Sequence, residues 1–494
     1  MAVTGPNVNP DRAGSGRGRV IFIGLLILLA WAPVPLGSNR PLAWAIAEIA
    51  ALTLFAAWFA GWRGLPGAAP EALPAARTQI ILLLLWLSAT GLSAVPIPTG
   101  VLAILSPAGM GARQLVLAGP DQSWSPLSLD AGATVEEFLK RASYVAVFVL
   151  TLALVDRPGR LRTMAGVLVA VGFAEAMYGL VNTLSGLEWQ LLGSKEYYRG
   201  YVTGTFVNRN HFAGHMELTL PLALGLLMAG FPRIGYSPTW RIFARNAVIM
   251  LSGAWGRTLF FCVVMFSGLF LSASRGGVAS FFAATGAVYM VFFAMRGVWS
   301  MEGRFAPAIL ALAVIAASWL GLGRLPARYD TTDLLLENRP KVWEDCIPLM
   351  RDYALTGSGA GTFKSVYPLY QNKNTSALFF DHAHNDYIES LVENGAPVSA
   401  LLLAAVALSL LRITAGFFKR RDPLMRGIIF ASLAGTISIL VHSIVDFNFQ
   451  IPANAIYFYT LLAMGLAACH VPSQGRKGRD REGRPLGGEG AQSL

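Results

Sequence analysis

The chain has 494 residues, of which 54% are hydrophobic and only 14% are charged, and its mean hydropathy is +0.52. Soluble domains carry about 25% charged residues, so the composition excludes an ordinary soluble enzyme and favours a protein that crosses a membrane many times. Three cysteines, Cys262, Cys346 and Cys469, are too few and too scattered for a disulfide framework or a zinc cluster.

Twelve apolar stretches are long enough, or nearly so, for a membrane-spanning helix of about 20 residues. They lie near residues 20–36, 42–62, 78–95, 138–155, 163–185, 212–231, 258–273, 277–295, 305–322, 397–412, 427–446 and 454–470. The second stretch follows the first almost at once and no clean cleavage pattern separates them, so we expect the first to be a retained span. The sequence predicts an all-α polytopic membrane protein with about 12 transmembrane helices.

Basic residues mark every second connection between these stretches. They occur at 12–19, 63–77, 157–162, 233–257, 296–304, 419–426 and 476–484. Because Arg and Lys in short loops favour the cytoplasmic side, both termini are expected in the cytoplasm. The same clusters account for most of the net charge of +11, so we interpret them as topology determinants and expect no nucleic-acid partner.

This topology divides the chain into five parts. They are a cytoplasmic tail (1–19), nine spans (20–322), a periplasmic loop (323–396), three spans (397–470) and a Gly/Arg-rich cytoplasmic tail expected to be disordered (471–494). The loop 323–396 is too long and too rich in Trp, Tyr and Gly for a connector, and long ordered loops are usually functional. Residues 330–353 have a helical pattern, which predicts a small helical cap on the bundle.

The stretch FFDHAHNDYIESLVENG, residues 379–395, holds two of the six histidines. Asp386 followed by Glu389 fits a capping box, which puts His384 directly before a helix N-terminus. The partial positive charge of that terminus keeps an imidazole neutral, as a base must be, and attracts an anion. We therefore expect His384 to be the base and His382 to be a supporting contact.

Two other interpretations of this stretch remain open. His384 could be a loop histidine that is hydrogen-bonded to the backbone. HAHND also matches the H-x-H-x-D opening of binuclear-metal hydrolases, although Tyr387 stands where those sites usually continue with histidine. His211 and His442 could complete such a site only if the fold brings them near.

Two arginines are candidates for anion binding. Arg275, in SASRGG, lies at the extracytoplasmic end of an apolar run, where it is either an interfacial anchor or an anion ligand. The glycines that follow it permit a close approach of backbone or ligand. Arg339, in ENRPKVW, lies one helical turn from Trp343, and its alternative role is a surface salt bridge to Glu337 or Asp345.

Other polar motifs lie in or near the spans. The run Asn208, Arg209, Asn210, His211 has more hydrogen-bonding side chains than a helix cap requires. GSGAGTF, residues 357–363, has no strand–helix unit around it, so we expect a tight loop under the cap rather than a dinucleotide site. Three intramembrane acids could be ion relays or buried hydrogen-bond partners; they are Glu48, Glu175 and Glu217.

A neutral histidine, arginines and many aromatic side chains on one side of a membrane suit transfer of a sugar. Arginine binds phosphate oxygens bidentately, and aromatic faces suit sugar rings. No ATP is expected outside the cytoplasm, so the donor must already be activated, as a lipid-linked pyrophosphate sugar is. His384 would take the proton from an acceptor hydroxyl, and Arg275 and Arg339 would neutralise the departing pyrophosphate. Direct displacement would invert the anomeric carbon.

The sequence resembles the O-antigen ligase and polymerase superfamily of bacterial inner membranes in the order of five motifs. These motifs are GTFVNRNHFAGH, SRGG, R…W, GSGAGTF and HAHNDYIESLVENG. The resemblance covers roughly residues 200–396. It implies a GT-C-like glycosyltransferase, independent of metal and cofactor, whose donor is an undecaprenyl-pyrophosphate-linked glycan. It also implies that His384 is the essential histidine and that Arg275 and Arg339 are the essential arginines. GSNRP, residues 37–41, resembles a segment of ligase-related proteins and makes Arg40 a secondary candidate.

The motifs do not separate the two activities of this superfamily. A ligase passes the glycan to the lipid A core, whereas a polymerase passes it to another lipid-linked repeat unit; we favour the ligase narrowly. A lipid-linked oligosaccharide transporter is a third possibility, which would need charges along the spans rather than at one face. The residues expected to bind substrate are Arg40, Asn208, Arg209, His211, His382, Asn385 and Trp343.

Overall fold

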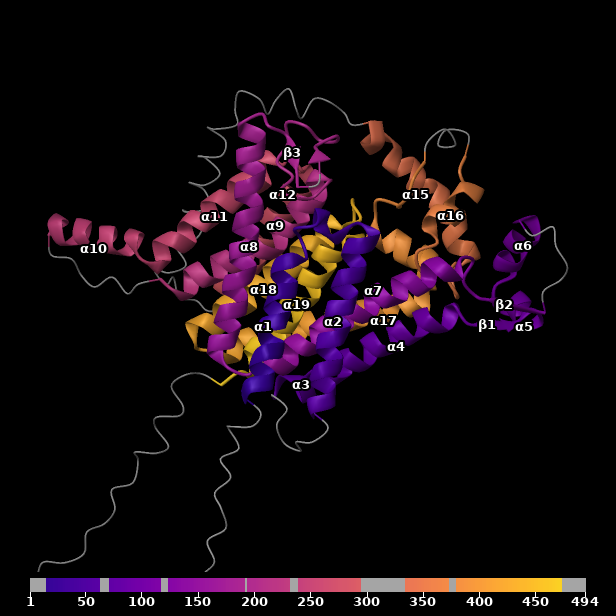
Figure 1. The fold of residues 1–494 in the computed structure, drawn as a ribbon, viewed down its shortest axis with the longest axis horizontal. Coiled ribbons are helices and arrows are strands. Elements are labelled where there is room, and N and C mark those ends of the chain that lie inside the picture. The colour runs from indigo at the N-terminus through magenta and orange to yellow at the C-terminus, as the bar shows by residue number, and fades with distance from the viewer. Residues whose placement is uncertain are drawn as a thin grey trace, which may run out of the picture.

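The computed structural model describes residues 15–62, 71–116, 123–191, 193–231, 239–294, 334–372 and 379–472. This part of the chain is mostly helical and also contains two short two-stranded sheets (Figure 1). Within it, eight helices are long and apolar enough to cross a membrane, so the chain is an all-α, multi-pass membrane protein. The expected span near 305–322 and most of both expected tails lie outside the described residues.

The long helices follow one another along the chain. They are α1 (Ser15–Trp31), α2 (Pro41–Trp62), α4 (Arg77–Ser93), α7 (Ala131–Leu154), α8 (Pro158–Leu184), α9 (Arg209–Ala229), α10 (Trp240–Ser252), α11 (Ala254–Leu271), α12 (Arg275–Ala294), α15 (Leu334–Asp352), α17 (Asp386–Lys419), α18 (Pro423–His442) and α19 (Pro452–His470). Apart from 305–322, each expected span overlaps one of these helices. The expected spans 397–412 and 138–155 belong to the longer helices α17 and α7, and α10 was not predicted.

Shorter elements connect the helices. They are η1 (Leu36–Ser38), α3 (Ala72–Ala75), β1 (Pro96–Pro98), α5 (Thr99–Leu105), α6 (Pro107–Val116), β2 (Trp124–Pro126), β3 (Trp189–Gln190), β4 (Gly193–Ser194), α16 (Phe363–Val366), η2 (Tyr367–Leu369) and η3 (Asn448–Gln450). Strands β1 and β2 pair antiparallel with Ile97 opposite Ser125, and β3 pairs with β4.

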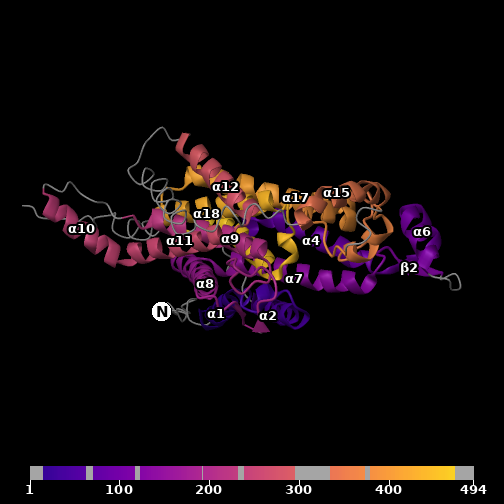
Figure 2. The ribbon, with the colours of Figure 1, turned by 90° about the horizontal axis from the view of Figure 1, so that it is seen from above.

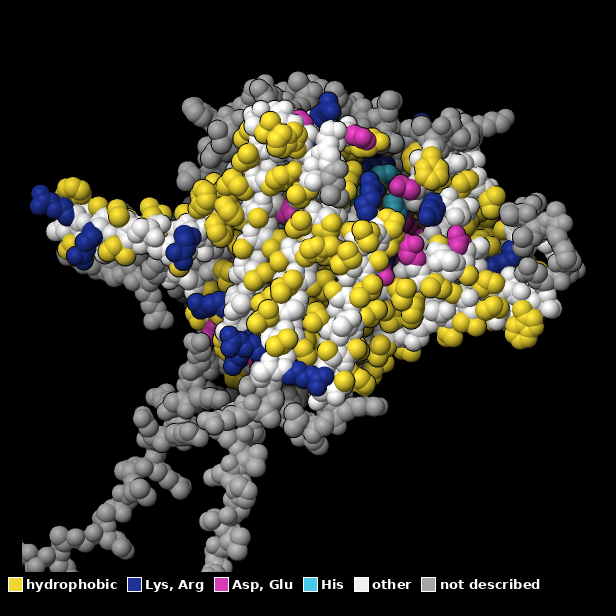
Figure 3. Space-filling view, viewed as in Figure 1, with side chains coloured by type: hydrophobic (Ala, Val, Ile, Leu, Met, Phe, Trp, Pro, Cys, Tyr) yellow, Lys and Arg dark blue, Asp and Glu magenta, His cyan; other side chains and the backbone are white. Residues whose placement is uncertain are grey.

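Helices α9, α18 and α19 form the centre of the bundle. In the most apolar 18-residue stretch of each of these helices, 83%, 78% and 94% of the residues are buried, compared with 22% for α2 and 28% for α17. Helices α9 and α18 pack closely because Gly225 and Gly427 face each other, and a Cβ on either would lie 2.2 Å from the other's carbonyl oxygen. The outer helices expose apolar side chains such as Leu411, which suits contact with lipid (Figure 3).

The two ends of the bundle differ in their side chains. At one end, η1 packs on the start of α9 and α19, because Gly37 contacts Phe206 and Ile451. At the opposite end, Arg412 hydrogen-bonds to Gln79 at 2.6 Å, and many arginines and lysines gather there along the lower edge in Figure 3. The hollow at the upper right of the same view holds histidines flanked by acidic and basic side chains.

The predicted helical cap is present beside the first turns of α17 (Figures 1 and 2). Helices α15 and α16 share a separate hydrophobic core with the segment before α17. Members of this core include Val342, Cys346, Tyr353, Phe363, Tyr367, Phe380 and Val392. Helix α17 itself bends at Gly395, where φ is +70°, so its first turns belong to the cap region and the rest to the bundle.

GSGAGTF forms the tight loop expected under the cap. Its three glycines all have positive φ, which disfavours side chains at these positions. The loop is held from two sides: Ser358 N–H donates to the Val392 carbonyl at 2.9 Å, and Leu129 N–H donates to the Ser358 carbonyl at 2.8 Å. A Cβ at Gly357 would lie 2.1 Å from the Glu393 carbonyl oxygen, so only glycine allows this approach.

Candidate active site

One aromatic ring brings the histidine motifs together. Phe447, in the turn between α18 and η3, lies 4.4 Å from the ring of His382, 4.8 Å from His384 and 4.6 Å from His211, measured between ring centroids. These histidines come from the segment before α17 and from the first turn of α9. The motifs NRNH and HAHND, about 170 residues apart in the sequence, therefore meet at the end of α18.

Asp446 lies at the base of this cluster and is fully buried. It accepts hydrogen bonds from Asn210 Nδ2 at 2.6 Å and from the Phe447 N–H at 2.8 Å, and its Oδ1 lies 3.7 Å from His211 Nε2. Burial alone would raise the pKa of Asp446, but His211 and the charge of Arg339 outweigh it and hold the pKa far below its usual value. Asp446 is therefore a buried carboxylate that organises its neighbours.

Arg339 extends from α15 into this cluster and is 9% exposed. Its guanidinium donates to the Val445 carbonyl and lies 3.4 Å from Asp446 Oδ2. The alternative partner Asp345 instead accepts hydrogen bonds from Tyr367 and Asn372, so it is engaged within the cap. Burial, a carboxylate on one side and a histidine cluster on the other make Arg339 part of a polar site rather than a surface salt bridge.

The cap also fixes the backbone that carries the two histidines. Trp343 Nε1 donates to the Ala383 carbonyl at 3.0 Å, and the Ala383 N–H donates to Glu389 Oε2 at 2.9 Å. His384 has a positive φ of 50°, which is uncommon for a residue other than glycine. These contacts on both sides of Ala383 hold the neighbouring His384 in that conformation.

The two histidines have opposite electrostatic environments. Burial alone would lower the pKa of His382, but Glu389, 2.7 Å from its Nδ1, outweighs that effect and raises the pKa to about 9. For His384, burial and then the charge of Arg339 lower the pKa to about 4. Its Nδ1 is buried and has no hydrogen-bond partner among the residues that the structure describes. At neutral pH, His382 is a cation and His384 is a neutral ring with an unengaged nitrogen.

The capping box predicted for Asp386 and Glu389 is wrong. Asn385 is the N-cap of α17, and its Oδ1 accepts from the N–H groups of Tyr387 and Ile388 at 3.0 and 3.1 Å. Asn is as good a cap as Asp, and here it comes one residue earlier. Asp386 is the first helical residue, and its carboxylate accepts from the Phe449 N–H. Glu389 is used by His382 and Ala383 rather than by the N-cap.

These contacts also bear on the H-x-H-x-D interpretation. His382 turns to Glu389, His384 lies on Phe447, and Asp386 bonds to the η3 backbone. The three side chains thus have separate partners instead of a common centre. Within the described residues, no group of three His, Cys, Asp or Glu side chains is arranged to hold a metal ion.

SRGG lies at the start of α12, against a buried ion pair. Glu217 Oε1 is 2.6 Å from His442 Nδ1, and Ser438 donates to the other carboxylate oxygen at 2.5 Å. A Cβ at Gly276 would lie 2.8 Å from the His442 ring, and one at Gly277 would lie 3.0 Å from Glu217. The glycines thus allow the first turn of α12 to pack on this pair, which sequence reasoning missed.

Arg275 is the first residue of α12 and is exposed at the same end of the bundle as the histidine cluster. The neighbouring Gly276 packs against Val445, with 3.2 Å between its Cβ position and Val445 Cγ2, and the carbonyl of Val445 accepts from Arg339. Gly276 of α12 and Arg339 of α15 therefore contact the residues just after α18 from two different helices.

The other candidate residues lie nearby but have different roles. Asn208 caps α9 by accepting from the Asn210 N–H at 2.8 Å. Arg209 lies over the ring of Tyr201, 4.4 Å from its centroid. Arg40 is exposed after η1 and donates to the carbonyl of its own neighbour, Asn39. Of the predicted substrate-binding residues, His211, His382 and Trp343 contact the cluster or its backbone.

Two of the three intramembrane acids act as hydrogen-bond partners. Glu217 binds Ser438 and His442, as described above, and Glu175 accepts from the Thr205 backbone N–H at 2.8 Å and from its hydroxyl. Thr205 precedes α9, so Glu175 of α8 anchors the segment that leads into the NRNH motif. Glu48 is also buried, on the other side of the bundle in α2.

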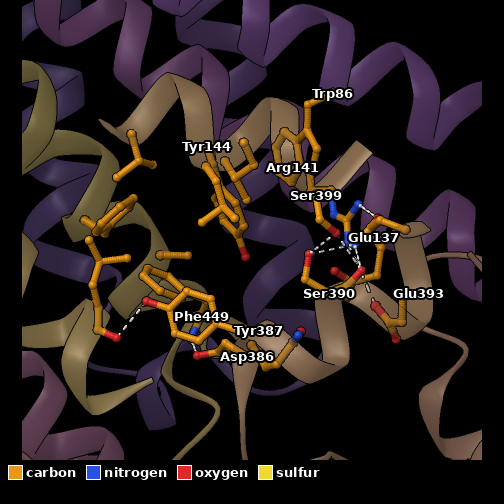
Figure 4. A pocket seen from close by; sticks show the side chains of 18 of the residues that line it. Trp86, Glu137, Arg141, Tyr144, Asp386, Tyr387, Ser390, Glu393, Ser399 and Phe449 are labelled. Atoms are coloured by element: carbon orange, nitrogen blue, oxygen red, sulfur yellow. Dashed lines mark hydrogen bonds and ion pairs between the residues drawn. The ribbon is translucent and has the colours of Figure 1, made fainter. Parts of the chain in front are cut away.

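A cavity of about 180 Å³ lies behind the first turns of α17 (Figure 4). Helices α4, α7, α17 and α19 supply most of its walls. Asp386 and Tyr387 line it, as do Trp86, Tyr144 and Phe449. Its polar side holds Arg141, which donates to Thr90 at 2.8 Å and to Asn394 at 2.6 Å, and lies 3.9 Å from Glu393.

Residues 260–403 match the family model described as O-Antigen ligase. The matched region runs from α11 through the cap and into α17, and it includes Arg275, Arg339 and His384. A comparison with curated proteins gives no match. The match agrees with the resemblance in the motifs and with the apolar helices of the structure. The chain is thus a multi-pass membrane protein in which residues 260–403 are similar to the O-antigen ligase family.

Proposed function

We propose that the protein transfers a glycan from undecaprenyl pyrophosphate to an acceptor hydroxyl on the periplasmic side of the bacterial inner membrane. The observation that carries this proposal is the neutral His384, whose buried Nδ1 has no partner among the described residues, beside the buried Arg339. A base next to a cation suits a reaction that removes a proton from one group while a negative charge develops on another. The family match supports a ligase- or polymerase-type enzyme.

Each group has one task in the proposed step. His384 takes the proton of the acceptor hydroxyl while the oxygen attacks the anomeric carbon, and the bond from that carbon to the pyrophosphate oxygen breaks. The electron pair leaves with the pyrophosphate, and Arg275 and Arg339 stabilise its charge. Attack opposite the leaving group inverts the anomeric configuration. Asp446 acts as a positioning residue, because it holds Arg339 and Asn210.

The distribution of charge supports the proposed side of the membrane. The end of the bundle opposite the histidine cluster carries the arginines and lysines of the short connections, for example Arg160, Lys419 and Arg421. Because such residues favour the cytoplasm, the cluster would face the periplasm. The centre of the bundle at α9, α18 and α19 is closely packed in the described residues, which favours chemistry at one face over transport through the middle.

Deletion of the gene, followed by glycan analysis, tests the function and separates its two forms. If the protein is a ligase, the deletion strain will retain lipid-linked polymer and lose its attachment to the lipid A core. If it is a polymerase of O-antigen or exopolysaccharide, only single repeat units will remain. Expression of the wild-type gene should restore the product, and His384→Ala at equal membrane abundance should not. Unchanged glycans in the deletion strain would refute the proposal.

A further inference from the structure

The cavity behind α17 has an apolar interior and a polar side whose cation, Arg141, is already paired. Apolar and aromatic side chains dominate its lining, with Leu402, Val406 and Phe458 along the part that lies within the bundle. Arg141, the cation in its wall, is engaged by Thr90, Asn394 and Trp86. Because this arginine has partners, the free surface of the cavity is mainly hydrocarbon, which favours an apolar ligand.

The cavity lies in the membrane-spanning part of the molecule and reaches its outer surface. Leu403 lines it and is 50% exposed, and the half-buried Leu402 and Leu440 also line it. Leu403 and Leu440 belong to helices that cross the membrane, so this surface faces lipid. A ligand that enters here comes from the bilayer, and its part inside the cavity is a hydrocarbon chain.

One wall of the cavity is shared with the histidine cluster. Asp386 and Phe449 line the cavity and are joined by a hydrogen bond of 3.2 Å. The Asp386 N–H donates to the Ser443 carbonyl at 3.0 Å, just after α18, and His384 lies two residues before Asp386. The cavity thus ends close to the proposed base.

Arg339 and Gly276, the residue after Arg275, contact the end of α18 and the residues just after it from other helices. Gly276, next to Arg275, packs on His442 and Val445, and Arg339 binds the Val445 carbonyl and Asp446. Helices α12 and α15 carry these arginines, and none of their described side chains lines the cavity. The residues that follow α18 therefore separate the arginines from the cavity.

An inverting displacement requires the acceptor to approach from the side opposite the leaving group. We propose that the cavity binds the hydrocarbon chain of the lipid-anchored acceptor, and that it thereby brings the acceptor's glycan to His384 from the side opposite Arg275 and Arg339. This inference rests on the proposed function. It assigns the two lipid-linked substrates to different sides of α18.

Two substitutions that narrow the cavity test this assignment. Leu402→Trp and Leu403→Trp place a larger side chain in its lining, and Leu411→Trp, at a 66% exposed position on the same helix, is the matched control. The acceptor is the lipid A core from the deletion strain if the protein is a ligase, or the lipid-linked single repeat unit if it is a polymerase. Its delipidated form is the same glycan released from the lipid. Both are assayed with the purified full-length protein and a lipid-linked glycan donor.

We expect both cavity variants to raise KM for the lipid-linked acceptor about tenfold, the equivalent of roughly two buried CH₂ groups. KM for the donor, transfer to the delipidated glycan and the activity of Leu411→Trp should stay unchanged. A rise in KM for the donor alone would assign the cavity to the other substrate and overturn the proposal. Equal losses with the lipid-linked and the delipidated acceptor would overturn it as well.

Failure of the proposed function would be recognised separately. If the wild-type protein transfers glycan to neither acceptor, that function is wrong, and native mass spectrometry then tests the cavity directly. Retention of the lipid-linked acceptor by the wild type and by Leu411→Trp, with loss from Leu402→Trp, would support a chain-binding site. Equal retention by all three proteins would refute it.

Discussion

The pKa of His384 leads to a prediction about how activity depends on pH. Burial and the charge of Arg339 lower this pKa from 6.5 to about 4, a change worth about 3 kcal/mol in favour of the neutral ring. At pH 7 only about one free molecule in a thousand therefore carries a protonated His384. Since the protonated ring cannot accept a proton, kcat/KM for the donor should fall only as the pH drops through about 4.

Binding of the donor should raise the pKa of His384 above its value in the free protein. The pyrophosphate brings negative charge to Arg339, which offsets the second of the two causes that lower the pKa of His384. The pKa in the complex should therefore be higher, and the acid limb of kcat should lie between pH 4 and 6.5. Burial still lowers the pKa in the complex, so the limb should not exceed the usual value for histidine.

The assay compares initial rates from pH 4 to 8 in the wild type and two variants. His384→Asn keeps a side chain that tolerates the positive φ of this position, and it should lose about 10²- to 10⁴-fold in rate at every pH. His384→Ala should behave alike, whereas His382→Ala should lose less and keep the acid limb. Any of three results would refute the reasoning. The first is an acid limb of kcat/KM near pH 6.5, and the second is an acid limb of kcat at a lower pH than that of kcat/KM. The third is a His384→Asn variant that retains activity.

Three further predictions concern the arginine, the topology and the leaving group. Arg275→Lys keeps the charge but loses the planar fork, so turnover should drop sharply at normal expression, whereas a mere interfacial anchor would tolerate lysine. Cys346 lies in the cap but is fully buried, and burial raises the pKa of its thiol to about 12. We therefore expect an impermeant thiol reagent, applied to spheroplasts, to miss Cys346 and to label Leu355→Cys, at a 74% exposed position of the cap. Labelling of Cys469 alone would show that the predicted topology is inverted. Activity should survive EDTA, since arginines are assigned the charge of the pyrophosphate, and inactivation reversed by zinc or manganese would revive the H-x-H-x-D metal site.

The features that the sequence predicted are those with a local cause. Membrane spans can be predicted because hydropathy over about 20 residues is a local property, and the position of His384 just before a helix could be predicted from a local pattern as well. The cap of that helix was misplaced by one residue because Asn385 and Asp386 have equal preference for the position. Their actual partners, the η3 backbone and the N–H groups of α17, depend on the fold.

The residues that were missed depend on contacts between distant segments. Asp446 and Phe447 follow a span in HSIVDFNFQ, and nothing nearby in the sequence pairs them with Arg339 or with the histidines. The available signal for Asp446 was an acidic residue that lies at the end of a predicted span and is flanked by apolar residues. The ion pair of Glu217 and His442 joins residues 225 positions apart, so each one alone resembled an isolated polar residue in a span.

If the protein transfers a glycan as proposed, the glycine loop under the cap limits how a long glycan can reach the proposed active site. Three backbone hydrogen bonds, from Leu129 to Ser358, from Ser358 to Val392 and from Gly359 to Glu393, join the loop to the start of α7 and to α17. Because the cap is held on both sides in this way, it cannot rotate away from the bundle as a rigid body without breaking these three hydrogen bonds. A polymer of many sugars would then have to reach the proposed active site without a hinged movement of the cap, so that a longer glycan demands no larger movement of the protein.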